Sequence, residues 1–561
     1  MTISDAPTDD FTFPVDELVG LPFNRAQSNP HGPCLSWPEG RFDNLEFASA
    51  VATTARIMST QHKIGRGSVV GVLLRNVPEV ITTMFATWSL GAALTPINPA
   101  LTDDEVNFQV EDSGVALLVG DPRAEAIADG RGIGFLSVGD DCFRGGDEPT
   151  GDLDVREDDG SLIIYTAGTT GKQKGCVLGQ ANISAMVWSI LNGLEFGENV
   201  RSLLVLPLFH CNGLLAGTVS PLMLGGSVHV LPKFDPKSFW EVVEAERPTY
   251  VSAVPTFYSV LEATTKRAVD TSSLRFVICS AAPMSPDAIT RFETRFDVTM
   301  LEDYGLSECS VAATLNRTDG TRRPGTVGTA LPGLRVATMD PGGQLLGTGE
   351  AGEAVVAGKT IMQGYLGRPE ATAETLKDGW LHTGDVGYLD EDGFLTLVDR
   401  FKDMIIRGGE NIYPKEIEDV LFSHPQVTEA AVVASPDDKY GEVPVAHVAL
   451  REGAATTVEE LHELLEARLA RYKVPGEIHI VASLPKNSVG KILKGSLREN
   501  WGREVHPRKG SIEVVEPHLQ TGLYNFDVAS CGSAVTRLRA VSRPSRTVRN
   551  IGRILPKTVQ R

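Results

Sequence analysis

Residues 165–175, Tyr-Thr-Ala-Gly-Thr-Thr-Gly-Lys-Gln-Lys-Gly, combine residue types that together can hold a polyphosphate. Glycines let the backbone turn its N–H groups inward, threonine hydroxyls add hydrogen-bond donors, and lysine ammonium groups neutralise negative charge. The apolar run 162–164 precedes the loop and predicts a short buried strand. The loop is not a Walker A motif, because Gln173 follows Gly171-Lys172 and no glycine stands at the required upstream spacing. Taken alone, the stretch could also be a solvated Gly/Thr surface loop.

Four further motifs follow the loop along the chain. They are Tyr304-Gly-Leu-Ser-Glu308, Trp380-Leu-His-Thr-Gly-Asp385, Asp399-Arg-Phe-Lys-Asp403 running into Arg407-Gly-Gly-Glu-Asn-Ile-Tyr-Pro414, and Pro485-Lys-Asn-Ser-Val-Gly-Lys-Ile492. In this order and spacing, the five motifs resemble the adenylate-forming superfamily, in its acyl- and aryl-CoA synthetase branch, which also has luciferases and peptide-synthetase adenylation domains as relatives. The resemblance covers residues 20–500, and five motifs in one order make coincidence negligible.

The resemblance implies an ATP site that brings a carboxylate to the α-phosphate. Because two anions must meet, the site needs phosphate donors, a divalent cation, a fixed nucleoside and a positive charge at the reacting atoms. By similarity, the ATP-binding residues are Thr166, Ala167, Gly168, Thr169, Thr170, Gly171, Lys174, Ser280, Ala281, Ala282, Asp303, Tyr304, Gly305, Leu306, Ser307, Asp385, Arg400 and Lys491.

Each part of this set has a predicted task. Asp385 and Arg400 match the pair that holds the ribose hydroxyls, although a surface ion pair is the alternative. Residues 280–282 and 303–304 match the adenine slot. Ala167 stands where the family usually has Ser and Gln173 where it usually has Pro, which removes one hydroxyl and some rigidity from the phosphate loop.

Four residues are predicted to be catalytic by the same resemblance: Lys491, His210, Lys174 and Glu308. The ammonium of Lys491 would offset charge between the carboxylate and the α-phosphate. Glu308 and Thr166 match the Mg²⁺ ligands, since Mg²⁺ is usually held by a carboxylate and phosphate oxygens. Outside its motif, Glu308 would be a solvated helix-cap acid, and His210 a polar core residue.

The resemblance also implies a second half-reaction with CoA. After the acyl-adenylate forms, the C-terminal domain would rotate about Lys402, withdraw Lys491 and bring Arg407, Gly408 and Gly409 to line a pantetheine tunnel. The predicted acyl pocket contains Phe209, His210, Phe257, Cys279 and Gly305. By the same resemblance, Phe209 and His210 gate the entrance of the acyl group. The candidate pocket segments mix aromatic, small and polar residues, so medium-chain, branched and aryl acids all remain open.

Three functions compete at this stage. The first is a stand-alone acyl-CoA ligase using Mg²⁺, ATP, CoA and a small carboxylic acid, with a place in fatty acid and lipid metabolism. The second is an adenylating enzyme with another acceptor, such as a carrier protein or a luciferase-like oxidation. The third is a non-catalytic nucleotide- or acyl-binding relative, which would be expected to have lost Lys491, Glu308 or Asp385, and none is lost.

Composition agrees with a chain of ordinary globular type. Its 561 residues exceed one typical domain, and 42% hydrophobic and 22% charged residues are typical of a water-soluble protein. A net charge of −20 argues against a nucleic-acid partner. Seven scattered cysteines without a C-x-x-C pair predict reduced core thiols in a cytoplasmic protein. Residues 80–102 lack charge, but their polar and turn residues predict a buried helix and strand rather than a transmembrane segment. A homodimer is left open.

The predicted fold is α/β. Strands are expected at 68–74, 117–120, 202–206 and 228–231, with helices at 238–246 and 287–295. This alternation predicts mainly parallel sheets flanked by helices, and Gly/Pro clusters at 324–333 and 341–352 predict a small β-rich subdomain. The domain boundaries are expected at 1–400 for the N-terminal AMP-binding (adenylation) domain and 401–504 for a mobile α+β C-terminal domain.

In that C-terminal domain, a helix is expected to open at Tyr413-Pro414 and another at a capping box from Thr457. Its apolar face would comprise Val458, Leu461, Leu464, Leu465, Leu469 and Tyr472. Residues 505–561 hold 10 Lys/Arg against 3 Asp/Glu and show little apolar periodicity, which predicts a disordered basic tail.

Overall fold

The computed structural model describes residues 12–146, 153, 155–167, 173–282, 284–400, 403–407, 410–437, 440–451, 453–486 and 492–498. All of them belong to one compact unit of the chain, residues 1–518. Some predicted residues therefore lie outside the described part of the chain: Gly168, Thr169, Thr170, Gly171, Lys402, Gly408, Gly409, Lys491 and the tail 505–561.

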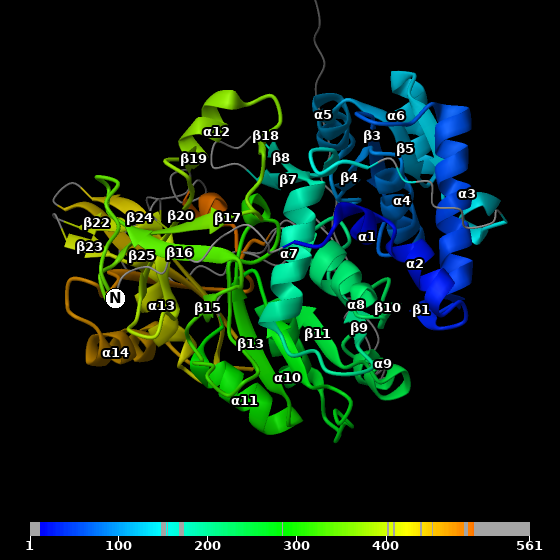
Figure 1. Cartoon of the computed structure of the whole chain (residues 1–561). Helices are drawn as coiled ribbons and strands as arrows, with labels where there is room; N and C mark the ends of the chain where they lie inside the picture. The colour runs from blue at the N-terminus through cyan, green and yellow to red at the C-terminus, as the bar shows by residue number, and fades with distance from the viewer. Residues whose placement is uncertain are drawn as a thin grey trace, which may run out of the picture. The chain divides into compact units, whose positions relative to one another are not determined.

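A seven-stranded sheet contains, near one edge, strands β7 and β8, which precede and follow residues 168–172 in the chain (Figure 1). Its strand order is β18-β8-β7-β4-β3-β5-β6. The pairs β7-β4, β4-β3, β3-β5 and β5-β6 are parallel, and the pairs β7-β8 and β8-β18 are antiparallel. Helices α4, α5 and α6 pack on its strands. The bounds are β3 Val69–Leu73, β4 Ala93–Ile97, β5 Val115–Gly120, β6 Gly134–Ser137, β7 Gly160–Ala167, β8 Gln173–Gly179, β18 Gly364–Tyr365, α3 Asn44–His62, α4 Pro78–Ser89, α5 Asp103–Ser113 and α6 Pro122–Arg131.

A nine-stranded sheet holds the predicted adenine and acyl segments. Its order is β15-β14-β13-β12-β11-β9-β10-β1-β2, parallel from β13 to β1. The bounds are β1 Pro33–Trp37, β2 Gly40–Asp43, β9 Arg201–Leu204, β10 Ser227–Val230, β11 Tyr250–Ala253, β12 Phe276–Cys279, β13 Thr299–Tyr304, β14 Thr314–Leu315 and β15 Thr329–Ala330.

Helices flank this second sheet. α9, α10 and α11 contribute to one buried cluster with β11 to β13, while α3, α4 and α7 join a larger cluster with strands of both sheets (Figure 1). The bounds are α1 Val15–Val19, α2 Leu21–Ser28, α7 Gln180–Gly193, α8 Ser220–Met223, α9 Phe239–Glu246, α10 Pro255–Thr264 and α11 Pro286–Phe296, with a π-helix at Asn212–Val219 and 3-10 helices at Asp141–Arg144 and Ser307–Cys309.

The remaining described strands form two mainly antiparallel sheets. The first has the order β16-β17-β20-β19 with β21 paired to β20, and the second β23-β22-β25-β24 with β26 parallel to β25. The bounds are β16 Leu334–Met339, β17 Gly352–Gly358, α12 Pro369–Thr375, β19 Leu376–Lys377, β20 Trp380–Leu389, β21 Leu395–Arg400, β22 Ile405–Arg407, β23 Glu410–Ile412, α13 Pro414–Phe422, β24 Val427–Asp437, β25 Gly441–Leu450, α14 Val458–Arg468 and β26 Glu477–Val481.

The predicted fold class is confirmed: parallel sheets with helices, a small β-rich part and a smaller C-terminal α+β part. The last has its own buried cluster, drawn from residues 405–478. The Thr457 capping box forms as predicted, with Thr457 Oγ1 accepting from Glu460 N at 3.2 Å. The helical face is shorter than predicted, because α14 ends at Arg468 and Tyr472 is exposed. The domain boundaries and the mobility stay predictions.

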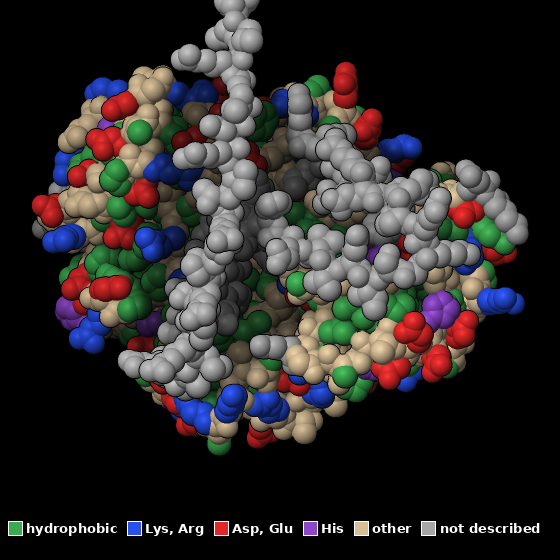
Figure 2. All heavy atoms as spheres, turned by 180° about the vertical axis from the view of Figure 1, so that it is seen from behind, with side chains coloured by type: hydrophobic (Ala, Val, Ile, Leu, Met, Phe, Trp, Pro, Cys, Tyr) green, Lys and Arg blue, Asp and Glu red, His purple; other side chains and the backbone are tan. Residues whose placement is uncertain are grey.

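The distribution of charged, cysteine and uncharged residues in the structure agrees with the sequence analysis. On the face drawn in Figure 2, acidic and basic side chains are interspersed. The six cysteines within the described ranges are buried free thiols. The uncharged stretch 80–102 forms most of the buried helix α4 and strand β4. Among the described helices, none is long and apolar enough to cross a membrane.

We expect the C-terminal sheet to lose stability in mild acid through His447 on β25. Burial, with His479 beside it, lowers the pKa of His447 to about 4, while 6.5 is the ordinary value. The unfolded chain therefore takes up the proton first as the pH falls, so the free energy of unfolding drops between pH 6.5 and 4, by at most about 3 kcal/mol.

Urea unfolding of the full chain at pH 7.5 and pH 5 checks this expectation. His447→Gln should show a smaller loss of stability between the two pH values than the wild type. His462→Gln, on the partly exposed side of α14, is the matched control and should keep the wild-type loss. Equal losses in wild type and His447→Gln would contradict the assignment.

Candidate active site

Strands β7 and β8 flank residues 168–172 and set the base of the predicted phosphate loop. Thr166 pairs with Lys174 across the antiparallel hairpin, so both predicted phosphate contacts stand at the same end of the sheet. The Lys174 ammonium lies 4.9 Å from the ring centre of Tyr365 on β18, the strand that pairs with β8. Cation–π contact of this kind restrains a long, flexible side chain.

The predicted magnesium ligand, Glu308, is buried in a short 3-10 helix. Its Oε1 accepts a hydrogen bond of 2.7 Å from the Tyr365 hydroxyl. Burial and the nearby Glu308 charge raise the pKa of Tyr365, which keeps the hydroxyl protonated and donating. A buried carboxylate without a partner is costly, so this hydrogen bond both stabilises Glu308 and fixes its direction.

The segment before Glu308 leaves no room for a side chain at Gly305. A Cβ there would overlap the carbonyl oxygen of Val311 and the Cα of Ala312. Met362 N donates to the Glu308 carbonyl at 2.8 Å, and the Cys176 thiol donates to the Ser307 carbonyl at 3.4 Å. The turn that carries Glu308 is therefore held by backbone packing and by neighbours from β8 and from the residues before β18.

The predicted ribose residues are brought together by two neighbouring strands. Asp385 on β20 pairs with Arg400 on β21. Asp385 is buried, and its Oδ2 accepts a hydrogen bond of 2.7 Å from the hydroxyl of Tyr304 at the end of β13. Tyr304, predicted for the adenine slot, thus contacts the predicted ribose carboxylate directly.

The remaining adenine-slot residues follow β12. Ser280 is buried, and its Oγ accepts a hydrogen bond of 3.1 Å from Asn212 Nδ2. Ala281 has a φ of 70°, the left-handed region that non-glycine residues seldom enter, so the chain makes a strained turn directly after the strand. Ala282 follows it with partial exposure.

His210 lies at the predicted acyl entrance, just before the π-helix. Its ring centre is 4.6 Å from that of Phe209. Burial lowers the pKa of His210 to about 4, so the imidazole is neutral at pH 7. Its Nε2 is buried and has no hydrogen-bond partner among the described residues. A neutral imidazole with one unpartnered nitrogen can bind a substrate group by hydrogen bonding.

The other predicted acyl and CoA residues have different surroundings. Phe257 is buried in the cluster that α9, α10 and α11 form with β11 to β13. Its ring centre is 4.0 Å from that of Phe234. Cys279 is buried beside Met284. Arg407 donates to the Tyr472 carbonyl at 2.6 Å. Lys486 and Ile492, on either side of residues 487–491, form an antiparallel bridge.

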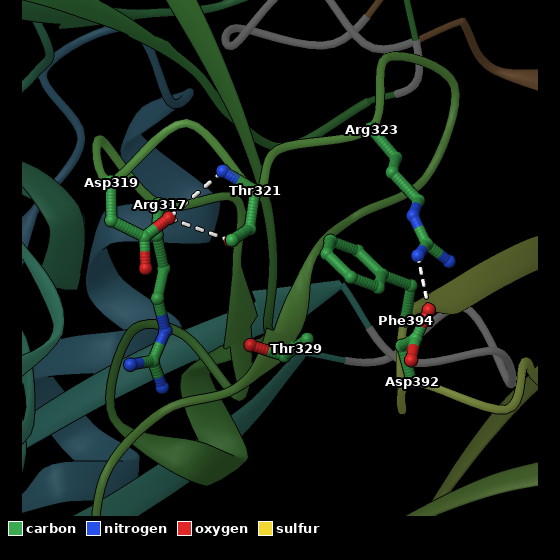
Figure 3. Close-up of a pocket in the computed structure, with 7 residues that line it drawn as sticks. All are labelled: Arg317, Asp319, Thr321, Arg323, Thr329, Asp392 and Phe394. Atoms are coloured by element: carbon green, nitrogen blue, oxygen red, sulfur yellow. Dashed lines mark hydrogen bonds and ion pairs between the residues drawn. The ribbon is translucent and has the colours of Figure 1, made fainter.

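A pocket of about 490 Å³ lies elsewhere and shares no residue with the predicted site (Figure 3). Its Arg323 pairs with Asp390 and Asp392 and lies over the Phe394 ring at 4.3 Å, so its charge is already balanced. This pocket is not where we expect the chemistry.

Tyr365 is the residue that the sequence did not single out. It lies 57 positions after Glu308, and no motif around it indicates a polar role. Only the pairing of β18 with β8 places its hydroxyl on Glu308 and its ring under Lys174.

The β7–β8 hairpin, the buried Glu308 and the buried Asp385 are the features expected of an enzyme that binds a nucleotide. The family model described as AMP-binding enzyme matches residues 23–366, and that of the AMP-binding enzyme C-terminal domain matches residues 416–491. The chain belongs to the AMP-binding enzymes of the adenylate-forming superfamily, in the acyl- and aryl-CoA synthetase branch, and is an AMP-forming acyl-CoA synthetase.

Individual relatives cover most of the chain. The feruloyl-CoA synthase of Amycolatopsis sp is 36% identical over 488 residues, which are 86% of this chain and 99% of the relative. The ATP-bound crystal structure of MatB from Rhodopseudomonas palustris is 30% identical, with a TM-score of 0.81 over 86% of this chain and 98% of that one.

The o-succinylbenzoate CoA synthetase MenE from Bacillus subtilis is also 30% identical. Its complex with the acyl-adenylate intermediate has a TM-score of 0.78 and covers 88% of this chain and 99% of that one. Its complex with ATP and a magnesium ion has a TM-score of 0.77, over 85% and 99%.

If Glu308 binds Mg²⁺ as predicted, Tyr365→Phe should weaken the metal response without removing the carboxylate. Loss of the hydroxyl frees Glu308 to rotate, so we expect about a 10-fold rise in the Mg²⁺ concentration that gives half-maximal acyl-AMP formation. Tyr388→Phe, on β20, is the control and should leave the Mg²⁺ titration unchanged. A wild-type titration in Tyr365→Phe would mean that the tyrosine only packs.

Proposed function

We propose that the residues at these strand ends activate a small carboxylic acid as its acyl-adenylate and then pass the acyl group to CoA. The products of the two half-reactions are diphosphate, then acyl-CoA and AMP. The observation that carries the proposal is the linked set Lys174–Tyr365–Glu308, which places a cation and a buried carboxylate next to the hairpin that flanks the phosphate loop. The relatives named above support CoA as the acceptor.

The roles that we propose for these residues follow from the charge of each side chain and from its position. Lys174 and the loop 166–171 would bind the phosphates, and Asp385 with Arg400 the ribose. Glu308 and Thr166 would hold Mg²⁺, which prefers oxygen ligands and neutralises phosphate charge when bound. Tyr304 would position Asp385, to which it already donates.

The acid lies against a neutral histidine in this proposal. With its pKa lowered to about 4, His210 cannot repel or attract the substrate as a full charge at pH 7. It can instead donate or accept one hydrogen bond near the carboxylate. The cation that offsets negative charge during adenylation would then be Lys491, and rotation about Lys402 would replace it by residues 407–409 for thioester formation.

The division of labour can be tested at Lys491. Lys491→Ala should lower acyl-AMP formation from acid and ATP by about 100-fold or more, because one preorganised charge at the reacting atoms is lost. Thioester formation from pre-made acyl-AMP and CoA should stay close to the wild-type rate. Lys494→Ala is the nearby control and should affect neither step. Equal losses in both half-reactions of Lys491→Ala would refute the assigned role.

A substitution at the predicted hinge, Lys402, should have the opposite effect: it should block thioester formation and spare adenylation. Lys402→Pro fixes φ near −65° and should block rotation while leaving ATP binding intact. We expect acyl-AMP to accumulate on the enzyme while CoA transfer fails, as measured by single-turnover chromatography of the bound nucleotide. Lys402→Ala, which keeps backbone freedom, should transfer normally. A wild-type thioester rate in the proline variant would exclude Lys402 as the pivot.

A further inference from the structure

A set of partly buried hydrogen bonds links Asn212, next to the predicted acyl entrance, to Ser280 directly after β12. Ser252 Oγ donates to Asn212 Oδ1 at 3.2 Å, and Asn212 Nδ2 donates to Ser280 Oγ at 3.1 Å. The Ser280 hydroxyl lies near the Asp303 carboxyl and lowers its pKa. Asp303 therefore stands next to this set of hydrogen bonds.

Asp303 has accepting capacity left over. An ionised carboxylate can take up to four hydrogen bonds. Asp303 Oδ1 is buried and has no hydrogen-bond partner among the described residues. Burial raises the pKa of Asp303 to about 7, and the Ser280 hydroxyl offsets part of that rise. An unpartnered buried acceptor costs free energy, and native proteins keep few such groups without a role.

The side chain of Asp303 faces the opposite side of β13 from that of Tyr304, and Ser280 of the predicted adenine slot lies beside it. Successive side chains of a strand face opposite sides, and the next residue, Tyr304, reaches Asp385 on the predicted ribose side. On the other side, Asp303 lies near Tyr258 and Cys279, which belong to the cluster under α10. The residue itself keeps partial exposure at the end of β13.

The same side of β13 meets the predicted acyl entrance. Asn212 begins the π-helix two residues after His210, and Cys211 between them contacts Ser307 of the Glu308 turn. Phe209, His210, Asn212, Asp303 and Gly305 all keep partial exposure. Asn212 and Asp303 therefore place polar groups near the predicted acyl entrance, although the buried cluster that contains Phe257 and Cys279 is otherwise aromatic and aliphatic.

We propose that Asp303, which lies beside Ser280, is a specificity-determining residue that binds a hydrogen-bond donor on the acid substrate, so the enzyme favours acids that carry a hydroxyl or amino group. This inference rests on the proposed function for the identity of the acid site, but it concerns only the first half-reaction. The donor would satisfy Asp303 Oδ1. An acid without the donor would leave that oxygen unpaired and would bind less well.

ATP–pyrophosphate exchange at pH 8 tests this proposal, because it reports adenylation alone and needs no CoA. The probes are matched acids: cinnamic acid with its 2-, 3- and 4-hydroxy and 4-amino derivatives, and hexanoic acid with 6-hydroxyhexanoic and 6-aminohexanoic acids. The wild-type enzyme should favour at least one donor-bearing acid over its parent by about 10-fold or more in kcat/KM.

Three variants separate the contributions. Asp303→Ala should remove the preference for the donor, measured as the ratio of kcat/KM for the donor-bearing acid to kcat/KM for its parent acid. Asp303→Asn should keep a response to the hydroxyl, since the amide still accepts, but lose any additional response to the amino group. Asp287→Asn, an exposed carboxyl on α11, is the control and should keep the wild-type preference.

Several outcomes would overturn the proposal. No discrimination by the wild type in either series would do so, as would an unchanged preference in Asp303→Ala. A selective rise in the KM for ATP in that variant would instead assign the side chain to adenine. If no acid gave thioester with CoA while the exchange preference held, the acceptor in the proposed function would fail and this inference would stand.

Discussion

The hydrogen bond from Tyr365 to Glu308 is the interaction on which the site depends. A buried carboxylate needs a donor, and the donor comes from a short strand, β18, whose position is set by pairing with β8. The same strand places an aromatic ring under Lys174. One pairing therefore fixes both the anionic and the cationic member of the site. Close backbone packing at Gly305 leaves no room for a side chain in the turn that carries Glu308.

Three carboxylates of the candidate site are partnered differently, and the difference separates the tasks that we propose for them. Glu308 and Asp385 each accept from a tyrosine hydroxyl. Asp303 lies near the Ser280 hydroxyl, and its Oδ1 has no hydrogen-bond partner among the described residues. Since a tyrosine fixes a carboxylate in direction while leaving its charge, the first two suit a metal ion and a diol. The third suits a donor that arrives with the substrate.

Much of the fold could be predicted because the apolar patterns are local. The expected strands at 68–74 and 228–231 correspond to β3 and β10, and the helix at 287–295 to α11. The Thr457 capping box formed for the same reason, since its two hydrogen bonds join residues three apart. The apolar face of α14 was predicted too long, because the helix ends at Arg468 and a periodic pattern cannot show where a helix stops.

The sequence by itself determined the class of enzyme and most of the polar residues of the candidate site. It could do so because the five motifs, with their glycines, lysines and carboxylates, are contiguous stretches of chain. It could not determine which side each residue of β13 faces in the folded site, nor that Tyr365 would meet Glu308. Those relations come from strand pairing between segments far apart in the chain, and from the burial that leaves one oxygen of Asp303 without a partner. Only the tertiary structure decides them, since hydrogen bonding and desolvation depend on neighbours that the local sequence does not specify.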